Sequence, residues 1–208
     1  QALIDLARSL NKKIKNISDI KKIEIYTSHH THNVIGTGAN DPQKMDPKAS
    51  RETLDHSIMY IFAVALEDGK WHHVDSYAPE RANTKSTVEL WKKIKTFEDK
   101  KWTKKYHDTN PNKKSFGGRV IIKMKDGSKI ADEISVADAH PNGKKPFKRK
   151  DYINKFETLT KFIIDEEESK RFLNDVQNLR NMTKSELHKL NIKVKSDQKN
   201  SISKKAIF

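Results

Sequence analysis

The chain has 208 residues, of which 34% are hydrophobic and 34% are charged, so it is long enough for one domain with a core or for two small ones. It contains no cysteine, which excludes disulfides, thiolate nucleophiles, zinc–cysteine sites and iron–sulfur ligands within these residues. The formal net charge is +14, and its excess lies between positions 101 and 150, where fourteen lysines and arginines face five acidic residues.

This charge alone does not indicate a nucleic-acid site. Much of it is lysine at alternating or turn positions such as Lys123, Lys125 and Lys129, and no arginine cluster or stacking-aromatic motif accompanies it. We therefore expect a solvated lysine-rich surface and no nucleic-acid partner, with a basic nucleic-acid-binding module as the alternative.

The sequence shows no membrane or secretion signal. No window approaches the roughly eighteen apolar residues needed to cross a bilayer, and the first residues lack a basic flank and an apolar core. We expect a cytoplasmic protein without a membrane partner. The chain starts with Gln1 in the middle of an amphipathic pattern, which favours a piece of a longer protein.

The first fifty residues predict a helix and then a strand. Apolar residues at helical spacing predict a helix of roughly three turns over residues 2–10, and alternation from Ile20 to Thr27 predicts a half-buried strand. His29, His30 and His32 follow. In an extended segment His30 and His32 would share a face and could hold a metal if a third ligand converged, but the sequence offers none, so we expect a polar strand or loop and no metal.

Residues 35–60 combine a polar loop with a helix that carries ionisable side chains. Gly36 and Gly38 mark the loop, and the missing third glycine argues against a dinucleotide fingerprint, so we expect no cofactor. A single helix is predicted from the cap at Ser50 to the stop at Gly69. One of its faces is apolar, and a second carries Thr53, His56, Ser57 and Tyr60.

On this helix His56 and Tyr60 lie one turn apart and form the best candidate site. The alternative interpretation is that both are hydrogen-bonded packing residues, which is the common role of such side chains on an amphipathic helix.

The rest of the chain predicts loops, one more helix, a hairpin and two final helices. The helix is expected over residues 87–97, between loops, and two alternating runs joined at Asp126-Gly127 predict a β-hairpin over residues 119–136. Helical spacing returns over residues 152–164 and 166–182. The fold class is therefore α+β, with a helical segment at the carboxyl end.

Several long strings carry a resemblance to a known family. They are GTGANDPQKMDPKASRETLDHSIMYIFAVALEDGKWHHVDSYAPERA, TVELWKKI, EDKKWTKKYH, FGGRVIIKMKDGS and ADAHPNGKKPF, in uninterrupted order over roughly residues 1–160. This segment resembles the MmgE/PrpD family, whose members have a large all-helical domain and a smaller α+β lid domain with the active site between them. The resemblance implies a lid over residues 1–147, returning helices of the helical domain over 148–195 and a flexible tail over 196–208.

The implied reaction is that of a hydro-lyase, which removes water from 2-methylcitrate to give 2-methyl-cis-aconitate in propionate breakdown (the methylcitrate cycle). By resemblance, Tyr60 aligns with an active-site tyrosine of the related cis-aconitate decarboxylase, and it is expected to act in catalysis by hydrogen-bonding a substrate carboxylate or relaying a proton. His56 is assigned to orienting or acid–base support, and Arg51 is expected either to face the anionic substrate or to pair with Asp55 at i,i+4. The family's active-site lysine, and the aspartate and histidines of its helical domain, would precede Gln1.

The resemblance also implies a tricarboxylate substrate and a homodimeric full-length enzyme. Because a family enzyme acting on citrate or cis-aconitate, as a dehydratase or a decarboxylase, would share the same lid, that reaction stays an alternative. Without the family's helical-domain residues, residues 1–208 are expected to be inactive on their own.

Overall fold

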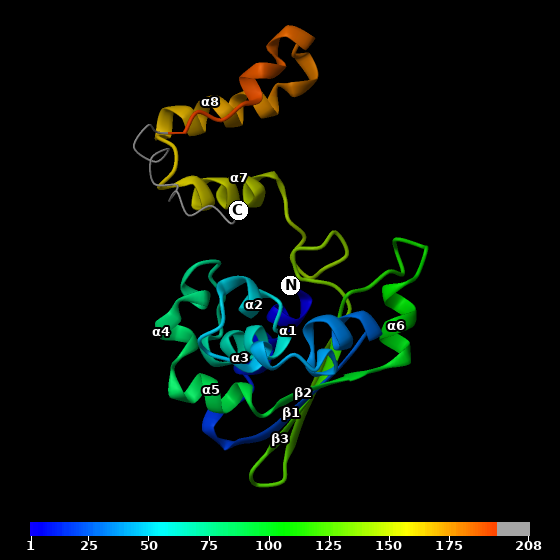
Figure 1. Ribbon diagram of the computed structural model, residues 1–208. Coiled ribbons are helices and arrows are strands. Elements are labelled where there is room, and N and C mark those ends of the chain that lie inside the picture. Colours follow the sequence, from blue (N-terminus) through cyan, green and yellow to red (C-terminus); the bar gives the residue numbers. More distant parts are fainter. Residues whose placement is uncertain (195–208) are drawn as a thin grey trace. The chain divides into compact units, whose positions relative to one another are not determined.

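The computed structural model describes residues 1–194, which form two compact units (Figure 1). The first is Gln1–Pro146, and the second begins at Phe147. The architecture is mixed α+β, as the sequence predicts. None of the helices in residues 1–194 is both long and apolar enough to cross a membrane. The tail predicted over 196–208 lies outside the described residues.

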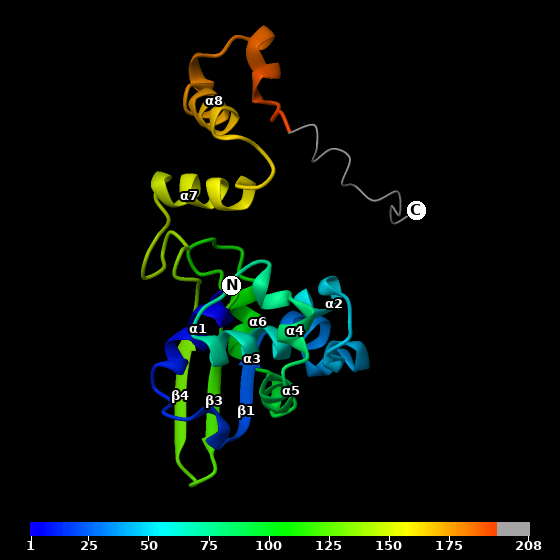
Figure 2. The same cartoon turned by 90° about the vertical axis from the view of Figure 1, so that its left-hand side faces the viewer.

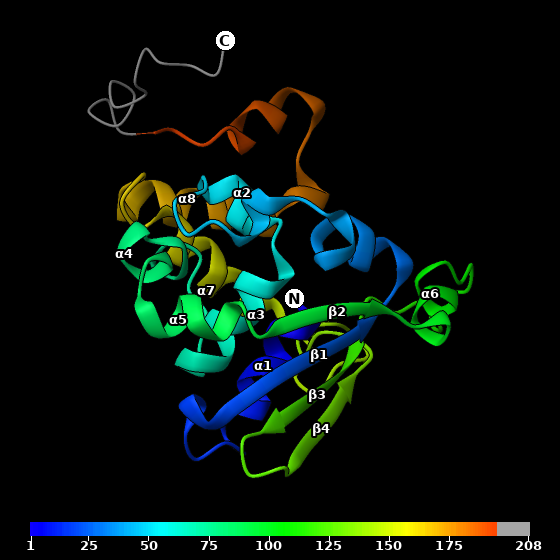
Figure 3. The same cartoon turned by 60° about the horizontal axis from the view of Figure 1, so that its bottom comes forward.

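A four-stranded sheet forms one layer of the first unit. Its strands are β1 (Ile20–Thr27), β2 (Ile94–Glu98), β3 (Gly118–Met124) and β4 (Lys129–Ile134), in the order β2-β1-β3-β4 (Figure 3). β1 is parallel to β2 and antiparallel to β3, and β3 and β4 form the predicted hairpin, seen beside β1 in Figure 2. Its turn contains Gly127 at a φ of +87°, a left-handed conformation that favours glycine.

One row of isoleucines shows how the register builds the core. Ile23 of β1 pairs with Ile94 of β2 and with Ile122 of β3, and Ile122 pairs with Ile130 of β4. Ile23, Ile94 and Ile122 are buried. Paired residues on neighbouring strands point to the same face of a sheet, so this row forms a continuous apolar surface.

Two helices bury their apolar surfaces with this sheet in one core. α1 (Ala2–Asn11) and α3 (Ile58–Asp68) pack against each other, and leucines of α1 share a hydrophobic cluster with the sheet. Every residue from Ile58 to Leu66 is buried, so α3 is a central helix that is apolar on all sides. As predicted, Gly69 ends it, at a φ of +63°.

The expected single helix over residues 51–68 is wrong, because the structure has two helices there. α2 (Arg51–Asp55) ends at His56, and α3 begins after Ser57. The Ser57 hydroxyl accepts a hydrogen bond from the Tyr60 backbone N–H at 3.3 Å and donates one to the Lys44 carbonyl at 2.7 Å, which fixes a new helix start. His56 and Tyr60 are therefore on different helices.

The predicted helix over residues 87–97 is also wrong in its second half. α5 (Lys85–Trp91) follows the short α4 (Pro79–Ala82) and ends at Trp91, after which the chain forms β2. Parallel pairing with β1 supplies the hydrogen bonds that a longer helix would have made internally. α6 (Lys100–Tyr106) lies in a predicted loop and is capped by Asp99, whose carboxylate accepts from the Lys101 backbone N–H at 2.9 Å.

The second unit contains α7 (Arg149–Thr160) and α8 (Glu166–Gln177). The two predicted helices exist, but both end before the expected residue. The rings of Phe156 and Phe172 stack with centroids 5.0 Å apart, so the two helices contact each other. Arg171 of α8 donates to Glu168, Asp175 and the Lys189 carbonyl, which ties the following segment to this helix.

Candidate active site

The candidate site lies where α2 meets the segment before α4. Ser50 caps α2 as predicted, because its hydroxyl accepts from the Thr53 backbone N–H at 3.2 Å. Arg51 follows in the first turn. Its guanidinium lies over the Tyr77 ring, 5.1 Å from the ring centre, and donates to the His73 carbonyl at 3.2 Å. Arg51 is exposed, so its remaining N–H donors are open to an anion.

Asp55 takes a different partner from the one that helical spacing suggests. Its carboxylate accepts a hydrogen bond from the Tyr77 hydroxyl, and among residues 1–194 no ion pair joins it to Arg51. Burial raises the pKa of Tyr77, and the hydrogen bond to Asp55 raises this pKa further. Tyr77 is therefore a neutral donor at neutral pH. Sequence reasoning missed this pair because Tyr77 comes from a loop 22 residues away.

Tyr60 lies beneath these groups and is fully buried. Its ring centre is 5.0 Å from that of Trp91 and 6.2 Å from that of Tyr77. Its hydroxyl donates to the Ser76 carbonyl at 2.6 Å, and burial raises the pKa of this hydroxyl to about 12. The Tyr60 hydroxyl is therefore a neutral hydrogen-bond donor, and it holds Ser76, the residue before Tyr77, in place.

His56 is exposed at the carboxyl end of α2. Its Nδ1 lies 2.8 Å from the Glu52 carbonyl oxygen. A carbonyl only accepts hydrogen bonds, so Nδ1 carries the proton and Nε2 has the lone pair. Nε2 has no hydrogen-bond partner within the described residues, and it can take a proton from a ligand or donate one after protonation.

We call this set of groups the α2 site: Arg51, Asp55 and His56 are exposed, Tyr77 contacts Arg51 and Asp55, and the buried Tyr60 packs against Tyr77. A guanidinium, a carboxylate and an imidazole are displayed on little more than one helical turn. Such a set can bind an anionic group and move a proton beside it.

The three histidines predicted in a strand or loop occupy a helical turn instead. Residues Thr31–Ile35 form one turn of π-helix, so the expected extended segment is wrong. The Nδ1 of His29 lies 2.9 Å from Glu98, the Nδ1 of His32 lies 2.7 Å from the Thr96 hydroxyl, and His30 stacks on Tyr106. Each ring has its own partner. Across residues 1–194, no group of three potential metal ligands assembles.

Comparison with known proteins places the chain. The MmgE/PrpD C-terminal domain model matches residues 1–181. The chain belongs to the MmgE/PrpD family. It is 29% identical over 134 residues to 2-methylcitrate dehydratase of Salmonella typhimurium, covering 64% of this chain and 26% of that protein.

Two further relatives carry similar names. A mitochondrial 2-methylcitrate dehydratase of Yarrowia lipolytica is 31% identical over 131 residues, covering 63% of this chain and 23% of that protein. The Escherichia coli K12 2-methylcitrate dehydratase is 27% identical over 134 residues, covering 64% of this chain and 26% of that protein. The chain thus spans about a quarter of the length of these relatives.

Proposed function

We propose that this MmgE/PrpD chain contributes the lid side of an active site that dehydrates 2-methylcitrate to 2-methyl-cis-aconitate. The observation that carries the proposal is the α2 site, in which Arg51 keeps open guanidinium donors and His56 an open ring nitrogen on the same short helical segment. The names of the three relatives support the substrate class, a branched tricarboxylate. From the family resemblance we also propose a homodimeric full-length enzyme, and from the sequence we propose a cytoplasmic location.

Dehydration removes a carbon-bound proton next to a carboxylate and expels the neighbouring hydroxyl as water, which leaves a carbon–carbon double bond. The substrate therefore needs a base that accepts the carbon-bound proton, a proton donor for the departing hydroxyl and cations for its carboxylates. We assign Arg51 to one substrate carboxylate. We assign His56 to proton transfer, because its Nε2 is the open ring nitrogen.

Tyr60 enters this proposal as a positioning residue. Its hydroxyl holds the Ser76 carbonyl, and the adjacent Tyr77 carries the Arg51 guanidinium on its ring and donates to Asp55. Because a buried hydroxyl bonded to a carbonyl has no free donor to offer a substrate, we infer that Tyr60 acts through Tyr77 and Arg51.

Binding to the chain of residues 1–208 tests the site directly. In an NMR titration with 2-methylcitrate, the amides of residues 51–57 and 73–77 should shift. Arg51→Gln should weaken binding about tenfold, which is the effect of losing one charge-assisted hydrogen bond. Parallel titrations use citrate and cis-aconitate. If either bound more tightly than 2-methylcitrate, that would favour the alternative, an enzyme acting on citrate or cis-aconitate.

Arg119→Gln is a matched control, because the Arg119 guanidinium also lies over a tyrosine ring, 4.8 Å from the centre of Tyr26. It removes the same charge from the same unit and should leave binding unchanged. The α2 site would be excluded as the binding site if Arg51→Gln and Arg119→Gln weakened binding equally. It would also be excluded if the amide shifts fell outside residues 51–57 and 73–77.

Turnover is a separate question, because the family's remaining active-site groups come from its helical domain. We expect residues 1–208 to release no alkene product from 2-methylcitrate, as followed by chromatography. Measurable turnover would mean that the described residues hold a complete site.

A further inference from the structure

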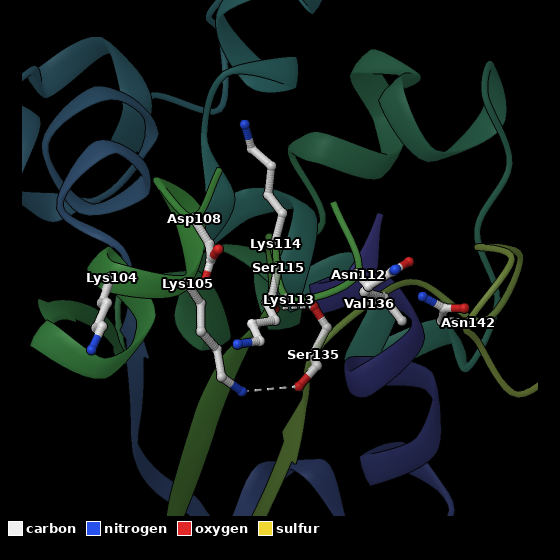
Figure 4. A pocket seen from close by; sticks show the side chains of 10 residues that line it. All are labelled: Lys104, Lys105, Asp108, Asn112, Lys113, Lys114, Ser115, Ser135, Val136 and Asn142. Carbon is white, nitrogen blue, oxygen red and sulfur yellow. Dashed lines mark hydrogen bonds between the residues drawn. The ribbon is translucent and has the colours of Figure 1, made fainter. Parts of the chain in front are cut away.

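A lysine-rich pocket lies in the first unit, apart from the α2 site (Figure 4). It has a volume of about 420 Å³ and is formed by the end of α6, the following loop and the segment after β4. Its lining residues are Lys104, Lys105, Asp108, Asn112, Lys113, Lys114, Ser115, Ser135, Val136 and Asn142. None of them belongs to the α2 site.

The lining is strongly positive. The lining contains four lysines and only one carboxylate, that of Asp108. The lysines are Lys104, Lys105, Lys113 and Lys114. One oxygen of this carboxylate accepts from the Asn110 backbone N–H at 2.9 Å and so closes the loop. Of the ion pairs within residues 1–194, none involves any of the four lysines. Within the described part of the chain, no ion pair therefore neutralises their charge.

The backbone beneath the lysines is fixed by the loop. The N–H groups of Lys113 and Lys114 both donate to the Asn110 carbonyl at 2.9 Å, and the Ser115 N–H donates to the Lys105 carbonyl at 3.1 Å. The Ser115 hydroxyl donates to the Ser135 carbonyl at 2.5 Å, which joins the loop to the end of β4. A ligand would not have to order this backbone, and that lowers the entropy cost of binding.

Two of the lysines point toward the same part of the pocket. The Lys105 Nζ lies 3.4 Å from the Ser135 hydroxyl and 4.7 Å from the centre of the Trp102 ring, which holds it in place. Figure 4 shows the Lys105 side chain extending toward Ser135 and the Lys113 side chain turned toward that of Lys105, whereas those of Lys104 and Lys114 extend away. Two ammonium groups with a nearby hydroxyl are the donors that a compact polyvalent anion requires.

We propose that this pocket binds a small polyvalent anion, either a phosphorylated compound or a polycarboxylate. Lys105 and Lys113 would supply the charge, and Ser135 and Asn112 would supply neutral donors. The volume suits a metabolite-sized ligand rather than a polymer. No aromatic side chain lines the pocket to stack with bases, so the lining favours a small anion over single-stranded nucleic acid.

The test is a titration of residues 1–208 with inorganic pyrophosphate, followed by NMR and calorimetry. Amides of residues 104–115 and 135–142 should shift, and pyrophosphate should bind more tightly than monovalent chloride at equal ionic strength. A parallel titration with citrate distinguishes the two ligand classes. Tighter binding of pyrophosphate would indicate a phosphorylated ligand, and tighter binding of citrate would indicate a polycarboxylate.

The variant with Lys105→Gln and Lys113→Gln should weaken pyrophosphate binding at least about tenfold. A second double variant, with Lys21→Gln and Lys129→Gln, removes the same charge from exposed lysines outside the pocket and should bind normally. Unfolding curves of both double variants check that each has folded.

Equal weakening in the two double variants would mean general charge attraction and would overturn the proposal. Tighter binding of a single-stranded oligonucleotide than of either small anion, lost in the pocket variant, would replace it with nucleic-acid binding. Arg51→Gln should leave the pyrophosphate-induced shifts of residues 104–115 and 135–142 intact, so failure here is distinct from failure of the proposed function.

Discussion

The first unit buries most of its large apolar side chains, whereas the second unit leaves most of its own exposed. In the first unit, leucines, isoleucines and aromatic residues of α1, α3, α5 and the sheet are buried together, whereas Ile164 is the one buried hydrophobic residue described after position 147. Of the twelve large hydrophobic side chains that are exposed within residues 1–194, nine lie in the second unit. They are Phe147, Tyr152, Leu159, Phe162, Ile163, Val176, Leu179, Leu187 and Ile192.

This difference separates two sources of stability. Removing apolar surface from water is the main favourable term for the first unit. The second unit relies more on capping and charged contacts, such as those of Arg171 with Glu168, Asp175 and the Lys189 and Asn191 carbonyls. Exposed apolar faces of this kind mark surfaces that associate with other protein surfaces. The predictions that follow test this contrast.

Truncating a core side chain should have the largest effect. Phe62→Ala removes a fully buried ring of α3 and should lower the free energy of unfolding by about 3–5 kcal/mol. Phe162→Ala, at a ring that is 76% exposed in the second unit, should change it by less than about 0.5 kcal/mol. Tryptophan fluorescence in urea reports the first unit, because Trp71, Trp91 and Trp102 all lie there, and far-ultraviolet circular dichroism in urea reports the helices of both units. If Phe62→Ala and Phe162→Ala lowered the free energy of unfolding equally, the two units would not differ in their dependence on apolar burial.

Losing one buried hydroxyl should cost less. Tyr60→Phe keeps the ring and leaves the Ser76 carbonyl without its donor, so the free energy of unfolding should fall by about 1–2 kcal/mol. Tyr152→Phe, at an exposed ring of the second unit, is the matched control and should be neutral. If Tyr60→Phe is also neutral, this hydrogen bond does not hold the 76–77 segment. In the full-length enzyme, the same change should lower the dehydration rate more than it disturbs folding.

Removing Arg171 should loosen the second unit alone. Arg171→Gln breaks its ion pairs and its contacts to the Lys189 and Asn191 carbonyls. Chymotrypsin should then cut residues 165–194 faster while residues 1–146 stay resistant, as followed by mass spectrometry. Arg180→Gln, an exposed arginine of the same unit, should leave cleavage unchanged. Faster cleavage throughout the chain would contradict the separation of the two units.

Acid should weaken each unit through a different carboxylate. Hydrogen bonds from Lys22 and Lys123 lower the pKa of Glu24 from 4.5 to about 2, and those from Arg171 lower the pKa of Glu168 from 4.5 to about 2. Because these pKa values are lowered by folding, their stabilisation is complete above pH 4.5 and is lost as the pH falls toward 2. NMR spectra recorded at each pH measure the folded fraction of each unit. Glu24→Gln should make the stability of the first unit depend less on pH between 4.5 and 2, and Glu168→Gln should do the same for the second unit.

Much of the local structure follows from short sequence signals. Alternation predicts β1 with its observed ends, Asp126-Gly127 predicts the hairpin turn, and Ser50 and Gly69 mark a helix start and a helix end where the structure has them. Asp99 was a usable signal for α6, since aspartate before a helical run is a common cap. These features depend on a few neighbouring residues, and so they can be predicted without the rest of the chain.

The features that matter for the site were decided by contacts between distant segments. The break between α2 and α3 depends on the bond from Ser57 to the Lys44 carbonyl, and β2 forms because it pairs with β1, about 70 residues earlier in the chain. Tyr77 reaches Asp55 from a loop that carries no periodic pattern.

The sequence by itself determined the α+β class, the family and the candidate residues Arg51, His56 and Tyr60, because capping, alternation and long matching strings are local properties. Only the tertiary structure showed that Arg51 and His56 are exposed while Tyr60 is buried. The physical reason is that α3 is apolar on every side, so packing against α1 and α5, rather than helical spacing, decides where its one tyrosine hydroxyl finds a partner.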